Sequence, residues 1–217
     1  MPKEKLSPAQ KAHKTRNKTY SKIRESILLI DCTLKGEEKC SETEFLEKYF
    51  QIINHQLRSE RKKEVEVDTE KKYSPKKLKD LLKTADYYSI HISSHGNVDK
   101  KKNTFLDLRY GKLYSKDLMG LWEEYPKIER PLVIVLSACC AGHKDLIEAL
   151  SNNGCRYCIA PVFPTDWEYA ALFSTFFYTY LFLRRMRPVT AFRKAIRSLP
   201  ELNGKWKMFD YGKEVRS

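Results

Sequence analysis

Short strand-like apolar runs, separated by segments with helical signals, are the feature that most limits what this chain can fold into. The clearest runs are Ile27–Cys32, Tyr87–Gly96, Pro131–Cys139 and Cys155–Ala160. Such runs are typical of strands that are buried on both faces of a parallel sheet. Because helical segments lie between them, the sequence predicts an α/β fold with a mainly parallel central sheet and helices on both faces.

The segments between these runs carry recognisable helix and hairpin signals. Ser41 and Glu44 match a capping box, in which a serine side chain binds the backbone at the start of a helix. Apolar residues follow at helical spacing: Phe45, Tyr49, Ile52, Ile53 and Leu57. Further predicted elements are a strand over residues 64–68, a helix from Ser74, a hairpin over residues 103–114, a helix from Ser115, and helices over residues 145–150, 166–185 and 188–199.

Length and charge bound the organisation of the chain. The 217 residues suffice for one domain, which we assign to residues 26–217 after a basic arm at residues 1–25 with almost no apolar periodicity. The formal net charge of +13 attracts polyanions such as nucleic acid or acidic protein surfaces. The basic residues are spread along the chain without interleaved aromatic residues. Solvated basic faces are therefore favoured over a nucleic-acid site.

The apolar runs also bear on the cellular compartment. None approaches the roughly 18 residues that a membrane span requires, and the N-terminus lacks the apolar core of a signal peptide. The sequence therefore predicts a cytoplasmic protein without membrane association. In that compartment the six cysteines are expected to be mostly reduced thiols.

Two predicted strands end in side chains that suit nucleophilic catalysis. His95 ends one strand and Cys139 ends the next. The carboxyl ends of neighbouring parallel strands face one crevice, so these side chains are predicted to lie close together. The thiolate is the attacking species, and a nearby imidazolium lowers the pKa of a thiol from about 8.5. Cys140 is an alternative nucleophile, because no spacing rule separates two adjacent thiols.

Two pairs of histidine or cysteine residues raise the question of a metal site. His91 and His95 form a His-x3-His pair, and Cys155 and Cys158 form a Cys-x2-Cys pair. Neither has an evident third ligand or a second pair of matching spacing. We therefore predict no metal and no other cofactor, with His91 as a hydrogen-bonded core histidine and the two cysteines as buried strand thiols. A metal-dependent enzyme at His91, His95 and the cysteines is kept as an alternative.

His95-Gly96, Ser137-Ala138-Cys139 and the hairpin predicted between them follow one another in a specific order. Residues 160–170 and the segment Ala191–Ala195 extend the pattern. This order and spacing resemble the caspase-like cysteine peptidases, and most closely the CHAT group related to caspases and separases. The resemblance covers about residues 26–200. It implies a caspase-like three-layer sandwich.

The resemblance implies roles for the residues around the predicted crevice. Cys139 would be the nucleophile, and His95 the base that assists it and protonates the leaving amine. The backbone N–H groups of Gly96 and Cys139 would form the oxyanion hole, where glycine lets the backbone approach a substrate closely. The resemblance requires no third catalytic carboxylate.

The same resemblance implies where the substrate residue before the cut, P1, would bind. Asp166 would lie in a loop that lines this pocket, and an acid there favours Arg or Lys. Asp166 equally suits the N-cap of the helix that follows it. Asp31, at the end of the first strand, is a second candidate acid, whereas Lys35 would suit an acidic P1 residue. A basic P1 residue is the preference that we predict.

These residues together predict a cysteine endopeptidase that cleaves a protein partner and acts as a regulated effector. Control would come from a regulatory or activating partner, from oligomerisation or from self-cleavage. The alternative from another class is a catalytically silent caspase-like adaptor, or a nucleic-acid-associated binding module that uses the basic arm. A degenerate site usually lacks one member of the dyad, and both members are present here, which favours the enzyme.

Overall fold

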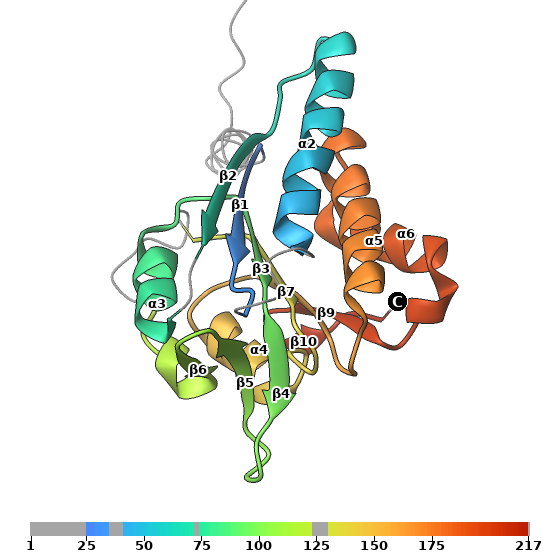
Figure 1. Cartoon of the computed structure of the whole chain (residues 1–217). Coiled ribbons are helices and arrows are strands. Elements are labelled where there is room, and N and C mark those ends of the chain that lie inside the picture. Colours follow the sequence, from blue (N-terminus) through green and yellow to red (C-terminus); the bar gives the residue numbers. More distant parts are fainter. Residues whose placement is uncertain (1–24, 35–40, 72–73, 123–129, 217) are drawn as a thin grey trace, which may run out of the picture.

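The computed structural model describes residues 25–34, 41–71, 74–122 and 130–216, and these residues form a large and a small sheet (Figure 1). The large sheet has seven described strands in the order β10-β9-β8-β7-β3-β1-β2. These strands are β1 (Ser26–Asp31), β2 (Glu66–Lys71), β3 (Ser89–Ser93), β7 (Val133–Ser137), β8 (Tyr157–Pro161), β9 (Trp206–Asp210) and β10 (Lys213–Glu214). From β2 to β8 they run parallel, and β9 and β10 are antiparallel at one edge. The predicted mainly parallel α/β sheet is confirmed.

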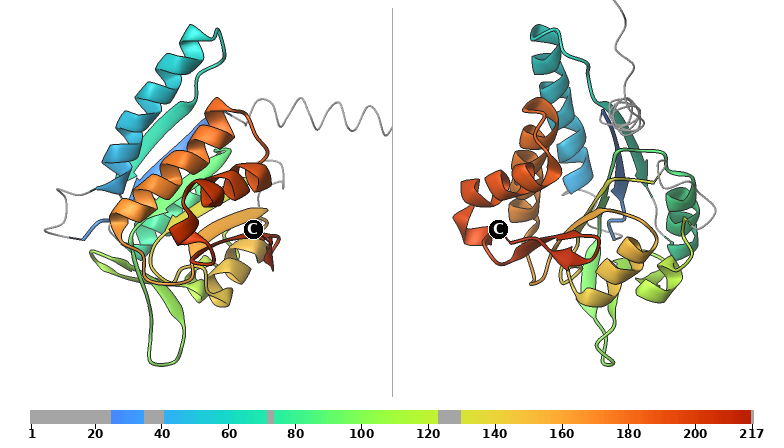
Figure 2. Two further views of the ribbon diagram at one scale, coloured as in Figure 1. Left: turned by 90° about the vertical axis from the view of Figure 1, so that its right-hand side faces the viewer. Right: turned by 180° about the vertical axis from the view of Figure 1, so that it is seen from behind.

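Helices cover both faces of the large sheet, which gives three layers (Figure 2). On one face lie α2 (Glu42–Ser59), α5 (Trp167–Tyr178) and α6 (Pro188–Ser198), and on the other lie α3 (Pro75–Thr84) and α4 (Lys144–Asn152). Alternate residues of β1 show the division. Ile27 and Leu29 belong to the core under α2 and α5, whereas Leu28 and Ile30 belong to the core under α3 and α4. The strand is apolar along its length because both of its faces are buried.

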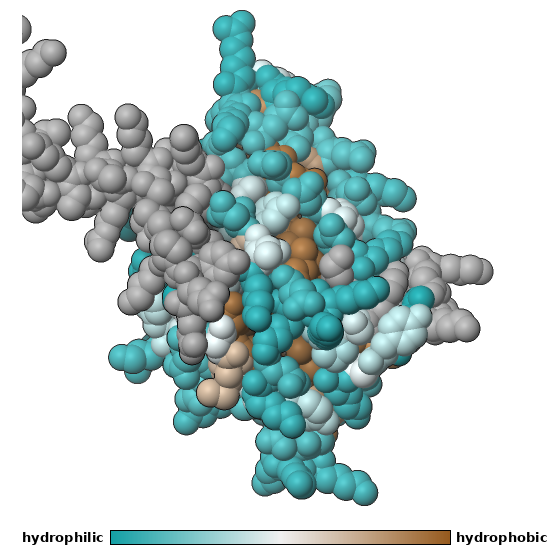
Figure 3. All heavy atoms as spheres, turned by 90° about the vertical axis from the view of Figure 1, so that its left-hand side faces the viewer, coloured by the Kyte–Doolittle hydropathy of each residue, from teal (hydrophilic) through white to brown (hydrophobic). Residues whose placement is uncertain are grey.

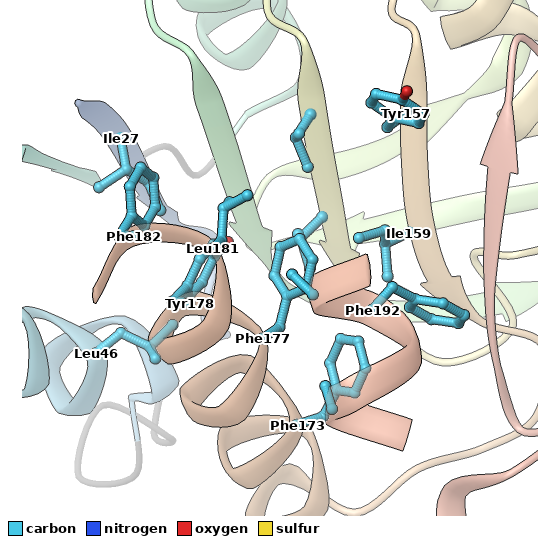
Figure 4. Close-up of a cluster of buried hydrophobic side chains, with 14 of the residues drawn as sticks. Ile27, Leu46, Tyr157, Ile159, Phe173, Phe177, Tyr178, Leu181, Phe182 and Phe192 are labelled. Carbon is cyan, nitrogen blue, oxygen red and sulfur yellow. The ribbon is translucent and has the colours of Figure 1, made fainter. Parts of the chain in front are cut away.

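The core between the sheet and α5 is rich in aromatic side chains (Figure 4). Phe173 and Phe177 are fully buried, and the ring of Phe173 stacks on that of Trp206 in β9 with 4.1 Å between ring centroids. Aromatic pairs add about 0.5–1.5 kcal/mol beyond the area that they bury. This packing holds the antiparallel edge of the sheet against α5. It also fixes where the loop between β8 and α5 can lie.

The small sheet begins just beyond the end of β3, and His95 is its first residue. Its antiparallel strands are β4 (His95–Val98), β5 (Thr104–Leu108) and β6 (Gly111–Tyr114). The β4–β5 hairpin projects from the body of the molecule (Figure 1). The hairpin predicted over residues 103–114 is confirmed as β5 and β6. The prediction of one strand ending at His95 is wrong, because β3 ends at Ser93 and His95 begins β4.

Two predicted helices differ from regular α-helices over part or all of their length. The helix expected from Ser115 is a 3₁₀ turn over Ser115–Leu118, in which the Asp117 carboxylate accepts the backbone N–H of Tyr114 at 2.9 Å. The helix expected over residues 166–185 consists of α5 and a π-helical turn at Thr179–Leu183. There the Thr179 hydroxyl donates to a carbonyl oxygen one turn earlier, at 2.7 Å. Such side-chain bonds compete with the regular helical ladder and bend it.

The side of the molecule where β2 and α3 lie is largely hydrophilic (Figure 3). On α3, the residues Lys76, Lys77 and Lys83 are exposed to solvent. Residues 1–24 of the predicted basic arm lie outside the described residues, as do Lys35 and Cys40. None of the helices that the structure describes has the length and apolar character needed to span a membrane.

Candidate active site

The carboxyl ends of β3 and β7 open into one pocket. The two strands are parallel neighbours, with Ser93 paired to Ser137 at their ends. Beyond β3 the chain leads to His95 and beyond β7 it leads to Cys139, so both residues lie at the same edge of the sheet. Both line a pocket with a volume of about 540 Å³. The structure therefore brings together the histidine and the thiol that the sequence analysis selected.

The Cys139 side chain is held by the loop between β8 and α5. The backbone N–H of Thr165 donates to Sγ of Cys139 at 3.4 Å, and the thiol donates to the carbonyl oxygen of Thr165 at 3.7 Å. Cys139 is half-buried, whereas His95 is exposed at the start of β4. The thiol is therefore accessible from the pocket while two backbone groups fix its position.

Gly96 brings the hairpin backbone against the backbone of the loop that carries Cys139. A Cβ added to Gly96 would overlap the carbonyl oxygen of Cys139, and it would lie 3.1 Å from both the amide nitrogen of Cys139 and the Cβ of Ala138. Glycine, which has no side chain, permits this approach. The two residues whose N–H groups were assigned to an oxyanion hole are thus adjacent in space.

A buried carboxylate that the sequence analysis missed lies beneath the pocket. Glu42, the first residue of α2, is only 4% exposed and yet lines the pocket. Its Oε2 accepts hydrogen bonds from Ser93 at 3.1 Å and from Ser137 at 2.6 Å. Its Oε1 accepts a hydrogen bond from Ser174 at 3.0 Å and lies 3.3 Å from Nε2 of His91. Each oxygen of the carboxylate therefore has two polar partners.

These partners keep Glu42 ionised. Burial by itself raises the pKa of Glu42, because it disfavours the charged form. The attraction of His91, 3.3 Å away, and the hydrogen bonds from Ser137 and Ser174 outweigh burial, so the pKa of Glu42 lies below its ordinary value. The carboxylate is a negative charge at neutral pH, set behind the two serine hydroxyls.

The buried face of α2 explains why Glu42 was missed. This face consists chiefly of Glu42, Leu46, Phe50, Ile53 and Leu57. The apolar spacing read from the sequence includes Phe45 and Ile52, which are 42% and 65% exposed. The true face has helical spacing too, but a charged residue begins it, and a search for apolar periodicity passes over that residue.

Comparison with known proteins identifies the family. The family model of the CHAT domain matches residues 38–205, which is most of the chain. The chain belongs to the CHAT domain family. No match was found among curated proteins.

Two solved structures share the fold of this CHAT domain. An inactive zymogen of the C11 protease from Parabacteroides distasonis is 10% identical with a TM-score of 0.52, and the match covers 87% of this chain and 62% of that protease. The Drosophila initiator caspase Dronc is 9% identical with a TM-score of 0.51, and the match covers 88% of this chain and 82% of the caspase. The chain thus spans less than two thirds of the C11 protease. The predicted caspase-like architecture is confirmed.

The two acids predicted for the P1 pocket of this CHAT domain lie in different surroundings. Asp166 is exposed at the start of α5 and lines the pocket, and its side chain makes no hydrogen bond that caps the helix. Asp31 is 3% exposed, and its carboxylate accepts hydrogen bonds from Thr33 and Ser41. Thr33, which donates to Asp31, is among the described residues that line the pocket. Asp166 is therefore accessible to a substrate side chain, and the role of Asp31 in P1 binding stays a prediction.

His91 and the Cys-x2-Cys pair are core residues of the CHAT domain. His91 is fully buried, with Nδ1 3.0 Å from the Tyr178 hydroxyl, and is the hydrogen-bonded core histidine that was predicted. It lies in β3, whereas His95 belongs to the small sheet. Cys155 and Cys158 are buried with 3.7 Å between their sulfur atoms. Among the described residues, no three His, Cys, Asp or Glu side chains gather as a metal site requires.

Cys140 differs from its neighbour in backbone conformation and titration. Its φ of 60° lies in the left-handed region, which few residues with a side chain adopt. Burial raises the pKa of the Cys140 thiol, and the adjacent Cys139 raises it further. The raised pKa makes the Cys140 thiolate harder to form, and among the described residues that line the pocket is Cys139 but not Cys140. Cys139 stays the predicted nucleophile.

Cys140 is expected to react slowly with iodoacetamide. In a Cys139→Ala variant, burial still raises the pKa of Cys140. At about pH 7.5 its alkylation should be slower than that of cysteine in a short peptide, because the thiolate is the reactive form. Mass spectrometry of samples quenched over time, repeated up to about pH 10, measures this difference. Alkylation at the peptide rate near neutral pH would contradict the raised pKa.

Proposed function

We propose that this chain is a cysteine endopeptidase that cleaves a protein partner through a Cys139–His95 dyad. Cys139 follows β7 of the large sheet and His95 begins β4 of the small sheet, yet both side chains line one pocket. This observation carries the proposal. Membership of the CHAT family and the caspase-like fold support it.

The dyad would act by acyl transfer. His95 takes the thiol proton as Sγ of Cys139 attacks the scissile carbonyl carbon, and the N–H groups of Gly96 and Cys139 donate to the oxygen that gains the negative charge. His95 then gives the proton to the leaving amine as the C–N bond breaks, which leaves a thioester on Cys139. Water that His95 deprotonates attacks the thioester, and the products are the new carboxyl terminus and the restored thiol.

The contact between Cys139 and Thr165 supports a regulated effector. The thiol proton in this structure is directed to a backbone carbonyl oxygen. Transfer of that proton to His95 requires the thiol to turn away from Thr165. A substrate or an activating partner that moves the loop between β8 and α5 would favour this rearrangement. We place the enzyme in the cytoplasm, with activity under the control of such a partner.

The charges around the pocket support a basic P1 residue. Of the described residues that line it, Glu42 and Asp166 are acidic, and none is Lys or Arg. An Arg or Lys side chain of a substrate would gain charge-assisted hydrogen bonds there, whereas an acidic side chain would meet like charge. Asp166 is placed to contact the substrate from the rim.

Covalent labelling with peptide acyloxymethyl ketones tests this proposal. Probes with Arg, Lys, Leu or Asp at P1 are incubated with the native protein and with Cys139→Ala and Cys140→Ala variants, and the modified residue is mapped by mass spectrometry. We expect the Arg and Lys probes to label Cys139 in the native protein and in Cys140→Ala. The buried thiols of Cys155 and Cys158 serve as internal references.

Each other outcome has a defined meaning. Labelling of several cysteines at equal rates contradicts the endopeptidase and favours a catalytically silent adaptor. Labelling of Cys140 in place of Cys139 would show that the proposal names the wrong nucleophile. Faster labelling of Cys139 by the Asp probe keeps the dyad and overturns the basic P1 residue.

A further inference from the structure

The geometry points to Glu42 as the residue that determines specificity, acting through the hydroxyls of Ser93 and Ser137 to make the pocket floor select a cationic guanidinium or ammonium side chain. This inference rests on the proposed peptidase function, for which it names the substrate class. It assigns the selection of the P1 residue to a buried charge instead of the exposed Asp166 alone.

The two oxygens of Glu42 face different parts of the molecule. Oε1 is engaged by Ser174 of α5 and by His91, which are not among the described residues lining the pocket. Oε2 accepts the hydroxyls of Ser93 and Ser137, and both serines line the pocket. The carboxylate is thus anchored on its core side and acts on the pocket through its other oxygen.

The serine hydroxyls transmit the charge by their orientation. A hydroxyl has one proton and two lone pairs. Because Ser93 and Ser137 each donate that proton to Oε2, only lone pairs of their oxygens remain for a ligand. The pocket floor therefore offers hydrogen-bond acceptors and no hydroxyl donor from these two residues. A ligand group rich in N–H donors fits this floor, and a carboxylate does not.

The negative charge has the strength to discriminate because of where it lies. Glu42 is 4% exposed, so solvent screens it far less than it screens a surface carboxylate. The chain as a whole carries +13, yet the described lining residues include two acids and no Lys or Arg. The pocket is a local acidic site in a basic protein. A cation that enters the pocket gains the acceptors of the floor, which Glu42 holds in this orientation, and the attraction of a carboxylate whose other oxygen is already paired with His91.

Arginine and citrulline at P1 provide the sharpest comparison, because they have nearly the same shape and differ in charge. We expect the native protein to hydrolyse, or to be labelled by, the arginine peptide about 10- to 100-fold faster than the citrulline peptide, the size expected for hydrogen bonds to a charged group. In Glu42→Gln this ratio should fall to about threefold or less, because a neutral amide replaces the charge.

Two serine variants serve where Glu42→Gln fails to fold. Ser137→Ala removes a pocket-facing acceptor and should lower the arginine-to-citrulline ratio. Ser174→Ala is the matched control, since it removes one bond to Oε1 without altering the described lining of the pocket, and it should lower the ratio less than Ser137→Ala does. Equal arginine-to-citrulline ratios in the native protein and in Ser137→Ala would overturn the inference. A preference for arginine that disappears in Asp166→Asn and persists in the Glu42 and serine variants would overturn it too.

Binding to a Cys139→Ala protein separates this inference from the proposed catalysis. Calorimetry with peptide amides that end in arginine or citrulline requires no chemistry. Preferential binding of the arginine peptide, lost in Cys139→Ala/Ser137→Ala, would support the floor even if the native protein proved inactive. Equal binding of the two peptides would overturn the inference even if the native protein proved to be a peptidase.

Discussion

Replacing His95 by alanine is expected to lower kcat/KM for a peptide substrate by about 10²–10⁴-fold, the contribution typical of a positioned general acid–base group. Replacing Cys139 by alanine is expected to remove hydrolysis, because no thioester can form. Cys140→Ala is the matched control, because it deletes the adjacent thiol, and its kcat/KM should stay within about threefold of the native value. Initial rates with a fluorogenic peptide that carries arginine at P1 measure all three variants.

Stability measurements separate lost chemistry from lost folding in this comparison. His95 is exposed at the first residue of β4, and exposed substitutions usually change stability by about 0.5 kcal/mol or less. The His95→Ala variant should therefore unfold in urea at nearly the native midpoint. Native kcat/KM in His95→Ala would exclude His95 as the base. Low activity together with an early unfolding midpoint would assign the loss to the fold.

The parallel part of the sheet could be predicted from sequence because its strands are buried on both faces. Every residue of β7 is buried, and so is every residue of β1 except Ser26. Apolar side chains therefore occupy successive positions, and the apolar run that marks a buried strand is continuous. The convergence of His95 and Cys139 followed from the strand order alone, since residues beyond neighbouring parallel strands emerge at one edge. These predictions needed no knowledge of side-chain packing.

The antiparallel edge of the sheet could not be predicted in the same way. In β9, Trp206 and Met208 are buried, Phe209 is nearly so, and Lys207 lies between them, which matches neither clear alternation nor a long apolar run. The strand is stabilised by its pairing with β8 and by the stacking of Trp206 on Phe173, both contacts between segments far apart in sequence. Such contacts leave no local pattern for sequence analysis to detect.

The acidic floor of the pocket shows the same limit at the level of the site. Asp166 was selected from the family resemblance and Asp31 because it ends a strand, and Asp166 does line the pocket. Glu42 follows no strand; it begins a helix whose first turn packs over the ends of β3 and β7, where Ser93 and Ser137 meet it. Its burial depends on three hydroxyls and a histidine from three other elements. A charged residue at a helix start ordinarily indicates a solvated end.

Gly96→Ala is expected to lower kcat/KM by at least about 10²-fold, because displacement of reacting groups by about 1 Å has an effect of this size. The added Cβ would overlap the carbonyl oxygen of Cys139, a backbone atom that cannot move without moving the nucleophile. Either the hairpin that carries His95 or the loop that carries Cys139 must therefore shift. Overpacking of this kind also costs about 1–3 kcal/mol of stability.

Two further variants identify the cause of that loss. Gly204→Ala is the control for replacing a glycine, because a Cβ added at Gly204 meets open space. The φ of +77° at Gly204 makes this substitution cost about 1 kcal/mol of backbone strain. Its kcat/KM should equal that of the native protein. Gly96→Ala/Ala138→Gly removes the contact with the Ala138 Cβ and keeps the overlap with the Cys139 carbonyl oxygen. It should not recover activity. Recovery in this double variant, or native kcat/KM in Gly96→Ala, would show that the close approach of the two backbones is not what positions the dyad and the oxyanion hole.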